Sequence, residues 1–413
     1  MNEEVELLAP VGSYESLMSA INAGADAIYF GVENLNMRSR SSINFSIQDL
    51  SKISKICKDS NVRNYITLNT VMYDEDMPLI RDIIDAAKFS KIDAIIASDL
   101  SVISYTRSQN LKVHISTQLS VSNIEAVKFY ASLADVMVLA RELSLEQIAN
   151  IIKEIKAQNI NGPSGKLIKI EVFIHGALCM AISGKCFLSQ HLHNASANRG
   201  ECYQVCRREF HVFDDQNSEL MIDNHYIMSP KDLCTLPFLD KIINAGVKLL
   251  KIEGRGRSPE YVKTVVTTYR DALNLISEGN FNPKKLISLE TQLKKVYNRG
   301  FWDGHYLGKM MHDWNTNIYG SKATTRKVYT AKCLKFFSKI RVGEFLMENG
   351  QLSVGDEILI IGPTTGTIEL IINELRKEDI SVQKVIKGEI FSLSINTYIV
   401  RSSDKIYRIE KTI

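Results

Sequence analysis

The sequence has no long apolar run, no strong excess of charge of one sign and no repeated or low-complexity segment. A membrane-spanning helix needs about 20 predominantly apolar residues, so this absence disfavours a transmembrane protein. The first ten residues, MNEEVELLAP, are acidic and contain no apolar signal core, which disfavours secretion and predicts a cytoplasmic location. The 50 basic and 47 acidic residues leave a net charge of +3. This balance gives no global indication of nucleic-acid binding, although it does not exclude a basic face.

Three familiar catalytic motifs are also missing. The chain has no His-Glu-x-x-His metalloprotease motif and no Gly-x-Ser-x-Gly nucleophile elbow. Gly304–Lys309 resembles a phosphate-binding loop, but it is one residue too short and neither Ser nor Thr follows the lysine. The sequence therefore lacks the usual signatures of zinc peptidases, serine hydrolases and P-loop NTPases.

Short apolar runs alternate with longer amphipathic stretches over the first 260 residues. This alternation is typical of parallel strands joined by helical crossovers, and eight such units predict a (β/α)8 barrel. An open doubly wound sheet is the alternative, but it normally has a glycine-rich turn after its first strand, whereas this chain has Ala9–Ser13, APVGS. The predicted strands are Val5–Ala9, Ala27–Gly31, Tyr65–Asn69, Ala94–Ala97, Val113–Ser116, Val136–Ala140, Ile168–Ile174 and Lys248–Ile252. The predicted helices are Ser13–Ala23, Ile47–Cys57, Met77–Phe89, Ile124–Ala131, Leu145–Ala157, Pro259–Glu278 and Leu286–Asn298.

The sequence predicts a barrel over residues 1–312, a linker over 313–327 and a C-terminal domain over 328–413. The last part consists of short β-type runs and tight turns, which predict a small antiparallel β-barrel. A long insertion, about 176–245, follows the seventh strand of the barrel. A connection of this length in a compact domain is usually functional or has structure of its own.

Polar side chains follow several of the predicted strands. Because (β/α)8 enzymes place their active sites at the carboxyl ends of the strands, we expect these side chains to meet at one mouth. The candidate substrate-binding residues are Arg38, Arg40, Gln118 and Arg141, and the candidate catalytic residues are His175, Glu253 and Arg255.

Five of the seven cysteines lie in the insertion, namely Cys179, Cys186, Cys202, Cys206 and Cys234. In a chain without an export signal, such clustering indicates metal or redox chemistry rather than disulfides. Cys57 and Cys333 stand alone in an amphipathic helix and a β run, and we expect both in hydrophobic cores. An iron–sulfur cluster takes four thiolates, and tetrahedral zinc takes the same ligands, so spacing alone leaves both open.

The longest informative segment is Glu171–Ser189, EVFIHGALCMAISGKCFLS. It resembles the signature of the peptidase U32 family, the collagenase-like peptidases. Further segments resemble the same family and extend the match over nearly the full chain: Leu7–Gly12, Gly24–Tyr29, Asn198–Cys202, Cys206–Arg207, Ser229–Cys234, Lys251–Arg255 and Asn298–Phe301.

The resemblance implies an activity different from the family's name. Better-understood members are oxygen-independent hydroxylases with a 4Fe-4S cluster, and this chain looks most like the branch that hydroxylates the wobble uridine of tRNA with prephenate as hydroxyl donor. The cluster ligands would be Cys179, Cys186, Cys202 and Cys206, with Cys234 as the alternate for Cys206. A basic rim for tRNA would comprise Arg199, Arg207, Arg208 and Arg257.

Two other functions compete with this interpretation. The family name suggests an endopeptidase that depends either on a metal or on a cysteine. A cysteine peptidase would use Cys179 and His175 as nucleophile and base, but this dyad leaves the other clustered cysteines without a role. A non-catalytic RNA-binding scaffold with structural zinc would use the same cysteines without turnover.

Overall fold

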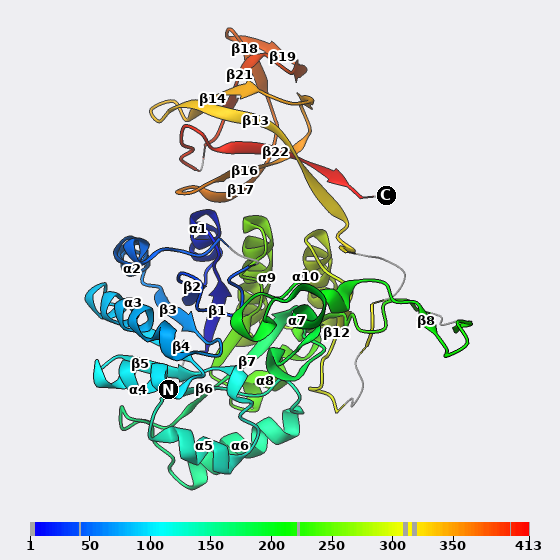
Figure 1. Cartoon of the computed structure of the whole chain (residues 1–413). Helices are drawn as coiled ribbons and strands as arrows, with labels where there is room; N and C mark the ends of the chain where they lie inside the picture. The colour runs from blue at the N-terminus through cyan, green and yellow to red at the C-terminus, as the bar shows by residue number, and fades with distance from the viewer. Residues whose placement is uncertain are drawn as a thin grey trace.

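The computed structural model describes residues 5–40, 43–220, 224–308, 313–315, 320–396 and 398–412. Eight parallel strands form a closed barrel, because β11 pairs with both β1 and β7. This confirms the predicted (β/α)8 fold and excludes the open sheet (Figure 1). The barrel strands are β1 (Glu6–Pro10), β2 (Ala27–Gly31), β3 (Arg63–Leu68), β4 (Ala94–Ala97), β5 (Lys112–Ile115), β6 (Val136–Val138), β7 (Lys169–Gly176) and β11 (Leu249–Ile252).

Amphipathic helices surround the barrel. In α3, for example, Ile80, Ile83, Ile84 and Ala87 recur at helical spacing, and all four are buried against the strands. The prediction did not include α4, whose sequence LSVISYTRS has a weak apolar pattern and leaves Leu100 exposed. The helices are α1 (Tyr14–Asn22), α2 (Leu50–Asp59), α3 (Met77–Phe89), α4 (Leu100–Ser108), α5 (Ile124–Ala131), α6 (Leu145–Ala157), α8 (Leu239–Asn244), α9 (Pro259–Ser277) and α10 (Pro283–Lys295).

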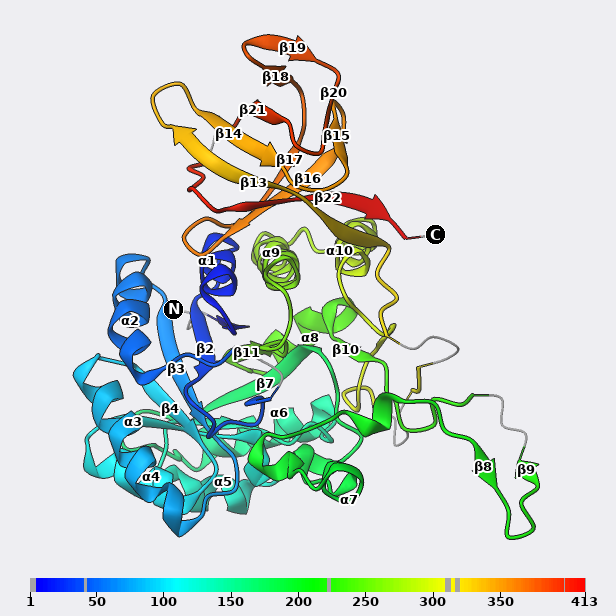
Figure 2. The same cartoon turned by 45° about the horizontal axis from the view of Figure 1, so that its top comes forward.

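The insertion after β7 has structure of its own and partly rejoins the barrel. It begins with α7 (Leu188–His193) and several 3-10 turns, and then extends a hairpin of β8 (Val212–Phe213) and β9 (Glu219–Leu220) away from the body (Figure 2). Its last strand, β10 (Asp232–Cys234), pairs antiparallel with the end of β7. The insertion is thereby anchored at the carboxyl end of β7, where the predicted site lies.

The C-terminal part forms antiparallel sheets around a separate core that includes Cys333, Phe345 and Phe391. It packs on the helices of the barrel, where the Ser19 and Thr367 hydroxyls are 2.9 Å apart (Figure 2). Its first strand begins at Thr325, three residues before the predicted boundary, and residues 316–319 of the predicted linker are outside the described residues. The strands are β13 (Thr325–Phe337), β14 (Val342–Met347), β15 (Gln351–Ser353), β16 (Glu357–Gly362), β17 (Gly366–Ile371), β18 (Leu375–Lys377), β19 (Ile380–Val382), β20 (Lys384–Ile386), β21 (Ile390–Ser394) and β22 (Lys405–Lys411).

Cys57 and Cys333 are both fully buried in apolar surroundings, which confirms their predicted place in the cores. Within the described ranges, no helix is long and apolar enough to cross a membrane.

Candidate functional site

A cavity of about 220 Å³ opens at the carboxyl ends of the barrel strands. Its wall combines cationic side chains, four cysteines and a few aromatic rings from β2, β7 and the loops that follow the strands. The cations are Arg38, Arg141, Arg207, Lys251, Arg255, Arg257 and Arg299, and the carboxylates on the wall are Glu142 and Glu253. Of the predicted substrate-binding residues, the cavity therefore brings together Arg38, Gln118 and Arg141.

Glu253 is the central carboxylate of this wall. It accepts two hydrogen bonds from Arg38, from Nη2 at 2.8 Å and from Nε at 3.2 Å, and one from the backbone N–H of Ala177 at 3.3 Å. Burial alone would raise the pKa of Glu253, but Arg38, Arg257 and Arg141 lower it to about 2. Glu253 is therefore an anion at every physiological pH and holds the loop after β2 against the loop after β7.

Two other arginines of the wall, Arg255 and Arg141, are fixed by neutral groups. Arg255 is buried and donates from Nη1 to the Thr67 hydroxyl at 2.6 Å, and burial lowers its pKa to about 10. Arg141 lies over the Phe173 ring at 3.7 Å and donates to the carbonyl oxygen of Ala177 at 2.9 Å. Their charges are thus held in place without a contacting carboxylate among the described residues, which suits them to bind an anion.

Four of the five clustered cysteines line the same cavity: Cys179, Cys186, Cys202 and Cys206. Burial raises the pKa of Cys206 to about 11; Arg207 lowers it, and the nearby Cys179, Cys202 and Cys186 raise it. In the described part of the chain, no three His, Cys, Asp or Glu side chains are grouped closely enough to hold a metal ion. The four thiols therefore line one cavity but do not converge on a single metal-ion position.

A glycine brings two of these loops together. Gly200 has a φ of 92°, and a Cβ built on it would lie 2.3 Å from the carbonyl oxygen of Asn36. Any side chain at this position would push apart the loop after β2 and the loop that carries Cys202.

Cys234, the alternate ligand, lies outside the cavity. It is buried on β10, where its backbone pairs with His175, and its Sγ accepts a hydrogen bond from the Tyr269 hydroxyl at 3.9 Å. Burial raises the pKa of its thiol to about 12. The surroundings of Cys234 are those of a core cysteine, because the antiparallel strand β10 turns it toward α9 and away from the mouth.

His175 also lies outside the cavity wall, contrary to its predicted place at the mouth. Its ring packs against Tyr261, Tyr269 and Phe301, and its Nδ1 is 3.4 Å from the Tyr269 hydroxyl. A bulge in the pairing of β7 with β11 occurs just before this residue and changes the direction of its side chain relative to Phe173, which lines the cavity. We assign His175 a structural role between the barrel and α9.

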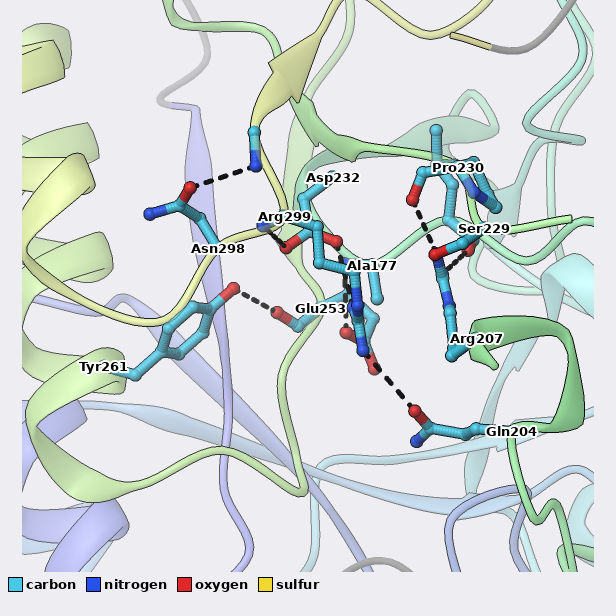
Figure 3. Close-up of polar contacts among 12 residues, drawn as sticks. Ala177, Gln204, Arg207, Ser229, Pro230, Asp232, Glu253, Tyr261, Asn298 and Arg299 are labelled. Atoms are coloured by element: carbon cyan, nitrogen blue, oxygen red, sulfur yellow. Dashed lines mark hydrogen bonds and ion pairs between the residues drawn. The ribbon is translucent and has the colours of Figure 1, made fainter. Parts of the chain in front are cut away.

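The predicted RNA-binding arginines fall into two groups. Arg199 is paired with Asp76 and Arg207 donates to Ser229, Pro230 and Leu178, so both are used internally (Figure 3 shows Arg207). Arg208 is exposed, with Nη2 3.3 Å from His193 Nε2, and Arg257 lies on the cavity wall, stacked 3.6 Å over Tyr297. The sequence alone could not show that Arg199 and Arg207 form their contacts with other segments of the same chain.

Arg40 is exposed and lies 3.5 Å over the Tyr203 ring, which is itself stacked on His193. It lines a pocket that adjoins the main cavity and shares Cys202 and Arg207 with it. Arg40 is thus next to the cavity rather than in it.

Comparison with known proteins places this site in a family. The model of peptidase family U32 matches residues 12–316, about three quarters of the chain. The chain belongs to peptidase family U32. A collagenase of Porphyromonas gingivalis is 52% identical over 99% of this chain and 98% of its own length. An uncharacterized protease of Methanocaldococcus jannaschii is 35% identical over 99% of both chains. The tRNA hydroxylation protein P1 of Bacillus subtilis is 31% identical over 91% of this chain and 88% of its own.

Sequence reasoning missed three polar residues inside the barrel of this U32 protein. Lys251 donates to Glu171 at 2.7 Å, and the second carboxylate oxygen of Glu171 lies 3.9 Å from His114 Nδ1. The signal was present, because a lysine and a glutamate interrupt the apolar strands KLLKIE and KIEVFI. Arg299 was also missed; it is buried against Asp232 in a segment far along the chain (Figure 3).

Two buried histidines make the stability of this U32 protein depend on pH. Burial lowers the pKa of His175 from 6.5 to about 3, and burial together with Lys251 does the same for His114. The pKa of each histidine in the unfolded chain is 6.5. At a pH between this value and about 3, each histidine takes up a proton only when the chain unfolds. Stability is therefore lost as the pH falls from 6.5 toward 3, at about 1.4 kcal/mol per pH unit for each histidine. We expect His175→Gln to reduce the slope of unfolding free energy against pH, measured in urea, by one proton; an unchanged slope would contradict the neutral state assigned to His175.

Proposed function

We propose that this protein is an iron–sulfur-dependent, oxygen-independent RNA hydroxylase whose substrate is the wobble uridine of tRNA and whose hydroxyl donor is prephenate. The observation that carries the proposal is the cavity, in which four cysteines and an excess of cations surround one space at the mouth of the barrel. A relative is named as a tRNA hydroxylation protein, which supports RNA as the partner.

The cysteine set fits a 4Fe-4S cluster. Such a cluster takes four thiolates, each bound to a different iron, so the sulfurs surround it and need not converge on one point. Cys179, Cys186, Cys202 and Cys206 line one cavity, which supports their assignment as the four ligands. A backbone N–H, that of Leu188, already donates to Cys186 Sγ at 3.4 Å, which is the kind of hydrogen bond that stabilises a cluster sulfur.

The charge of the cavity fits both the cluster and an acidic donor. The wall carries seven cations, opposed by Glu142 and Glu253 on the wall and by Glu171 and Asp232 behind it, which leaves three positive charges. A cluster held by four thiolates is anionic overall, and prephenate is a dicarboxylate, so both would lower the repulsion among these cations.

In this proposal the chain's own residues bind and orient the reactants. Arg141 and Arg255 hold the carboxylates of the donor, and the Arg38–Glu253 pair fixes the loop that closes over it. The cluster would be held by Cys179, Cys186, Cys202 and Cys206, and when bound it would supply redox chemistry next to the donor's hydroxyl. The exposed Arg208 and Arg40 contact RNA phosphates around the mouth.

An endopeptidase is the second candidate, because a relative with 52% identity is named a collagenase. A cysteine peptidase would need a base beside Cys179, yet His175 packs behind the barrel wall, outside the cavity that Cys179 lines. If the protein is nevertheless a cysteine peptidase, it should cleave gelatin, and Cys179→Ala should abolish the cleavage. Hydrolysis by purified protein that persists without iron would favour it over the hydroxylase.

The proposal is tested by two measurements on the full chain. Protein purified without oxygen should contain about four irons and as many acid-labile sulfides per chain. A strain lacking the gene should lose 5-hydroxyuridine-derived nucleosides from its tRNA, measured by mass spectrometry, and regain them with the wild-type gene. Zinc in place of iron, or unchanged tRNA in the deletion strain, would overturn the proposal.

A further inference from the structure

The barrel interior holds a buried ion pair between Lys251 and Glu171, to which the proposed function assigns no role. Lys251 is 4% exposed and Glu171 0%, and their charged atoms are 2.7 Å apart. Leu250 and Ile252 pack toward the surrounding helices, so Lys251 points the opposite way, into the barrel. Replacing such a pair with apolar residues often costs nothing, so stability alone is a weak reason for its presence.

Lys251 faces the floor of the cavity. It is one of the wall residues, and its ammonium lies 4.5 Å from the centre of the Tyr29 ring and 5.5 Å from that of Phe173, which are both on the wall as well. An ammonium has three hydrogen-bond donors. Among the described residues, one of them has a partner, the Glu171 carboxylate.

The other side of the pair is held from behind. The second oxygen of Glu171 and the Nδ1 of His114 are both buried, 3.9 Å apart, and neither makes a hydrogen bond within the described residues. The His114 ring packs against Tyr65 at 4.6 Å. Glu171 is thereby confined between Lys251 and His114, and it directs the ammonium toward the cavity.

Two further cations share the cavity wall with Lys251. Arg255 follows it by four residues on the same segment, and Arg141 reaches the cavity from the loop after β6. Burial lowers the pKa of Lys251, and the charges of Arg255 and Arg141 lower it as well. Three cations with one contacting carboxylate repel one another in a buried space. A bound anion removes this repulsion, so the floor has the chemistry of a carboxylate site.

We propose that Lys251 binds the carboxylate of the cavity's small-molecule ligand at the floor, with Glu171 and His114 as positioning residues. This inference rests on the proposed function for the ligand's class, a small organic acid. It adds an orientation, because the acidic end points down the barrel while the other end points to the cysteines at the mouth.

The test must separate ligand binding from stability, because Lys251→Met alone leaves Glu171 charged and unpaired inside the barrel. The informative variant is therefore Lys251→Met combined with Glu171→Met, which removes both charges and keeps similar volumes. The matched control is Lys128→Met with Glu125→Met, which removes an exposed ion pair of the same 2.7 Å length from α5.

The experiment measures prephenate binding by calorimetry on full-length protein purified without oxygen, and the thermal midpoint of each variant. We expect the double variant, Lys251→Met with Glu171→Met, to stay folded and to bind prephenate about 10- to 100-fold more weakly. This loss of affinity corresponds to the loss of one charge-assisted hydrogen bond. The control pair should bind like wild type.

Two results would overturn the inference in distinguishable ways. If the folded double variant binds prephenate as wild type does, Lys251 has a structural role only and the proposed function is unaffected. If wild type binds neither prephenate nor phenylpyruvate, the cavity is not an organic-acid site, and both the inference and the proposed donor fail. If the double variant does not fold, then Lys251→Gln, which keeps hydrogen-bond donors without charge, decides: unchanged affinity in this variant would also refute the inference.

Discussion

Replacement of Cys186 by serine is expected to remove most of the iron from the protein and to abolish tRNA hydroxylation. Cys186 lies on the cavity wall with three other cysteines, and its sulfur already accepts a backbone hydrogen bond. A serine hydroxyl is a poor ligand for iron–sulfur clusters, so the ligand set would fall from four to three. We expect the iron content of protein purified without oxygen to fall from about four per chain to below one. Activity should fall by at least about 100-fold, as is typical when a catalytic centre is removed.

The controls for this prediction come from the cysteines outside the cavity. Cys234→Ala and Cys57→Ala should keep the full iron content, because both side chains are buried in apolar surroundings. Each should lower the unfolding free energy by about 1 kcal/mol, as expected for a small core truncation. The ligand set proposed here would be refuted if Cys234→Ala lost iron while Cys206→Ser kept it.

The sequence was sufficient to predict the barrel because its signals are local and repeated. Most strand residues are apolar, and several helices begin at a side chain that caps them. Ser144, for example, accepts a hydrogen bond from the backbone N–H of Gln147 at the start of α6. The helix α4 was missed for a local reason as well, since Leu100 is exposed and the buried face is short.

The site could be predicted only in part, because its members meet through long-range packing. Spacing grouped five cysteines, but it could not show that β10 pairs back on β7 and removes Cys234 from the group. The bulge beside His175 likewise turns a residue away from the mouth at a point where strict alternation predicts the opposite. Arg199 and Arg207 look like a basic rim in sequence, yet their partners are Asp76 and backbone carbonyls that lie far away along the chain.

Replacement of Glu253 by glutamine is expected to be the most damaging change of charge in the cavity. The variant would keep the shape of the side chain but would leave Arg38 without its ionic partner. Removing one partner of a buried pair typically costs about 3–5 kcal/mol. The pKa of Glu253, about 2 against an ordinary 4.5, independently gives about 3 kcal/mol. Urea denaturation at neutral pH measures the loss, and prephenate binding should weaken because the loop after β2 is released.

The pH dependence of this effect separates the carboxylate from other causes. A carboxyl group with a lowered pKa contributes its full stability above the unfolded value and loses it as the pH falls from 4.5 to about 2. The difference in unfolding free energy between wild type and Glu253→Gln should therefore shrink over this range. Glu142→Gln is the matched control, since Glu142 lies on the same wall but is exposed, and it should change stability by less than about 0.5 kcal/mol. If the difference in unfolding free energy between wild type and Glu253→Gln were the same at all pH values, Glu253 would act through packing. This result would refute a stabilising role for the Arg38–Glu253 ion pair.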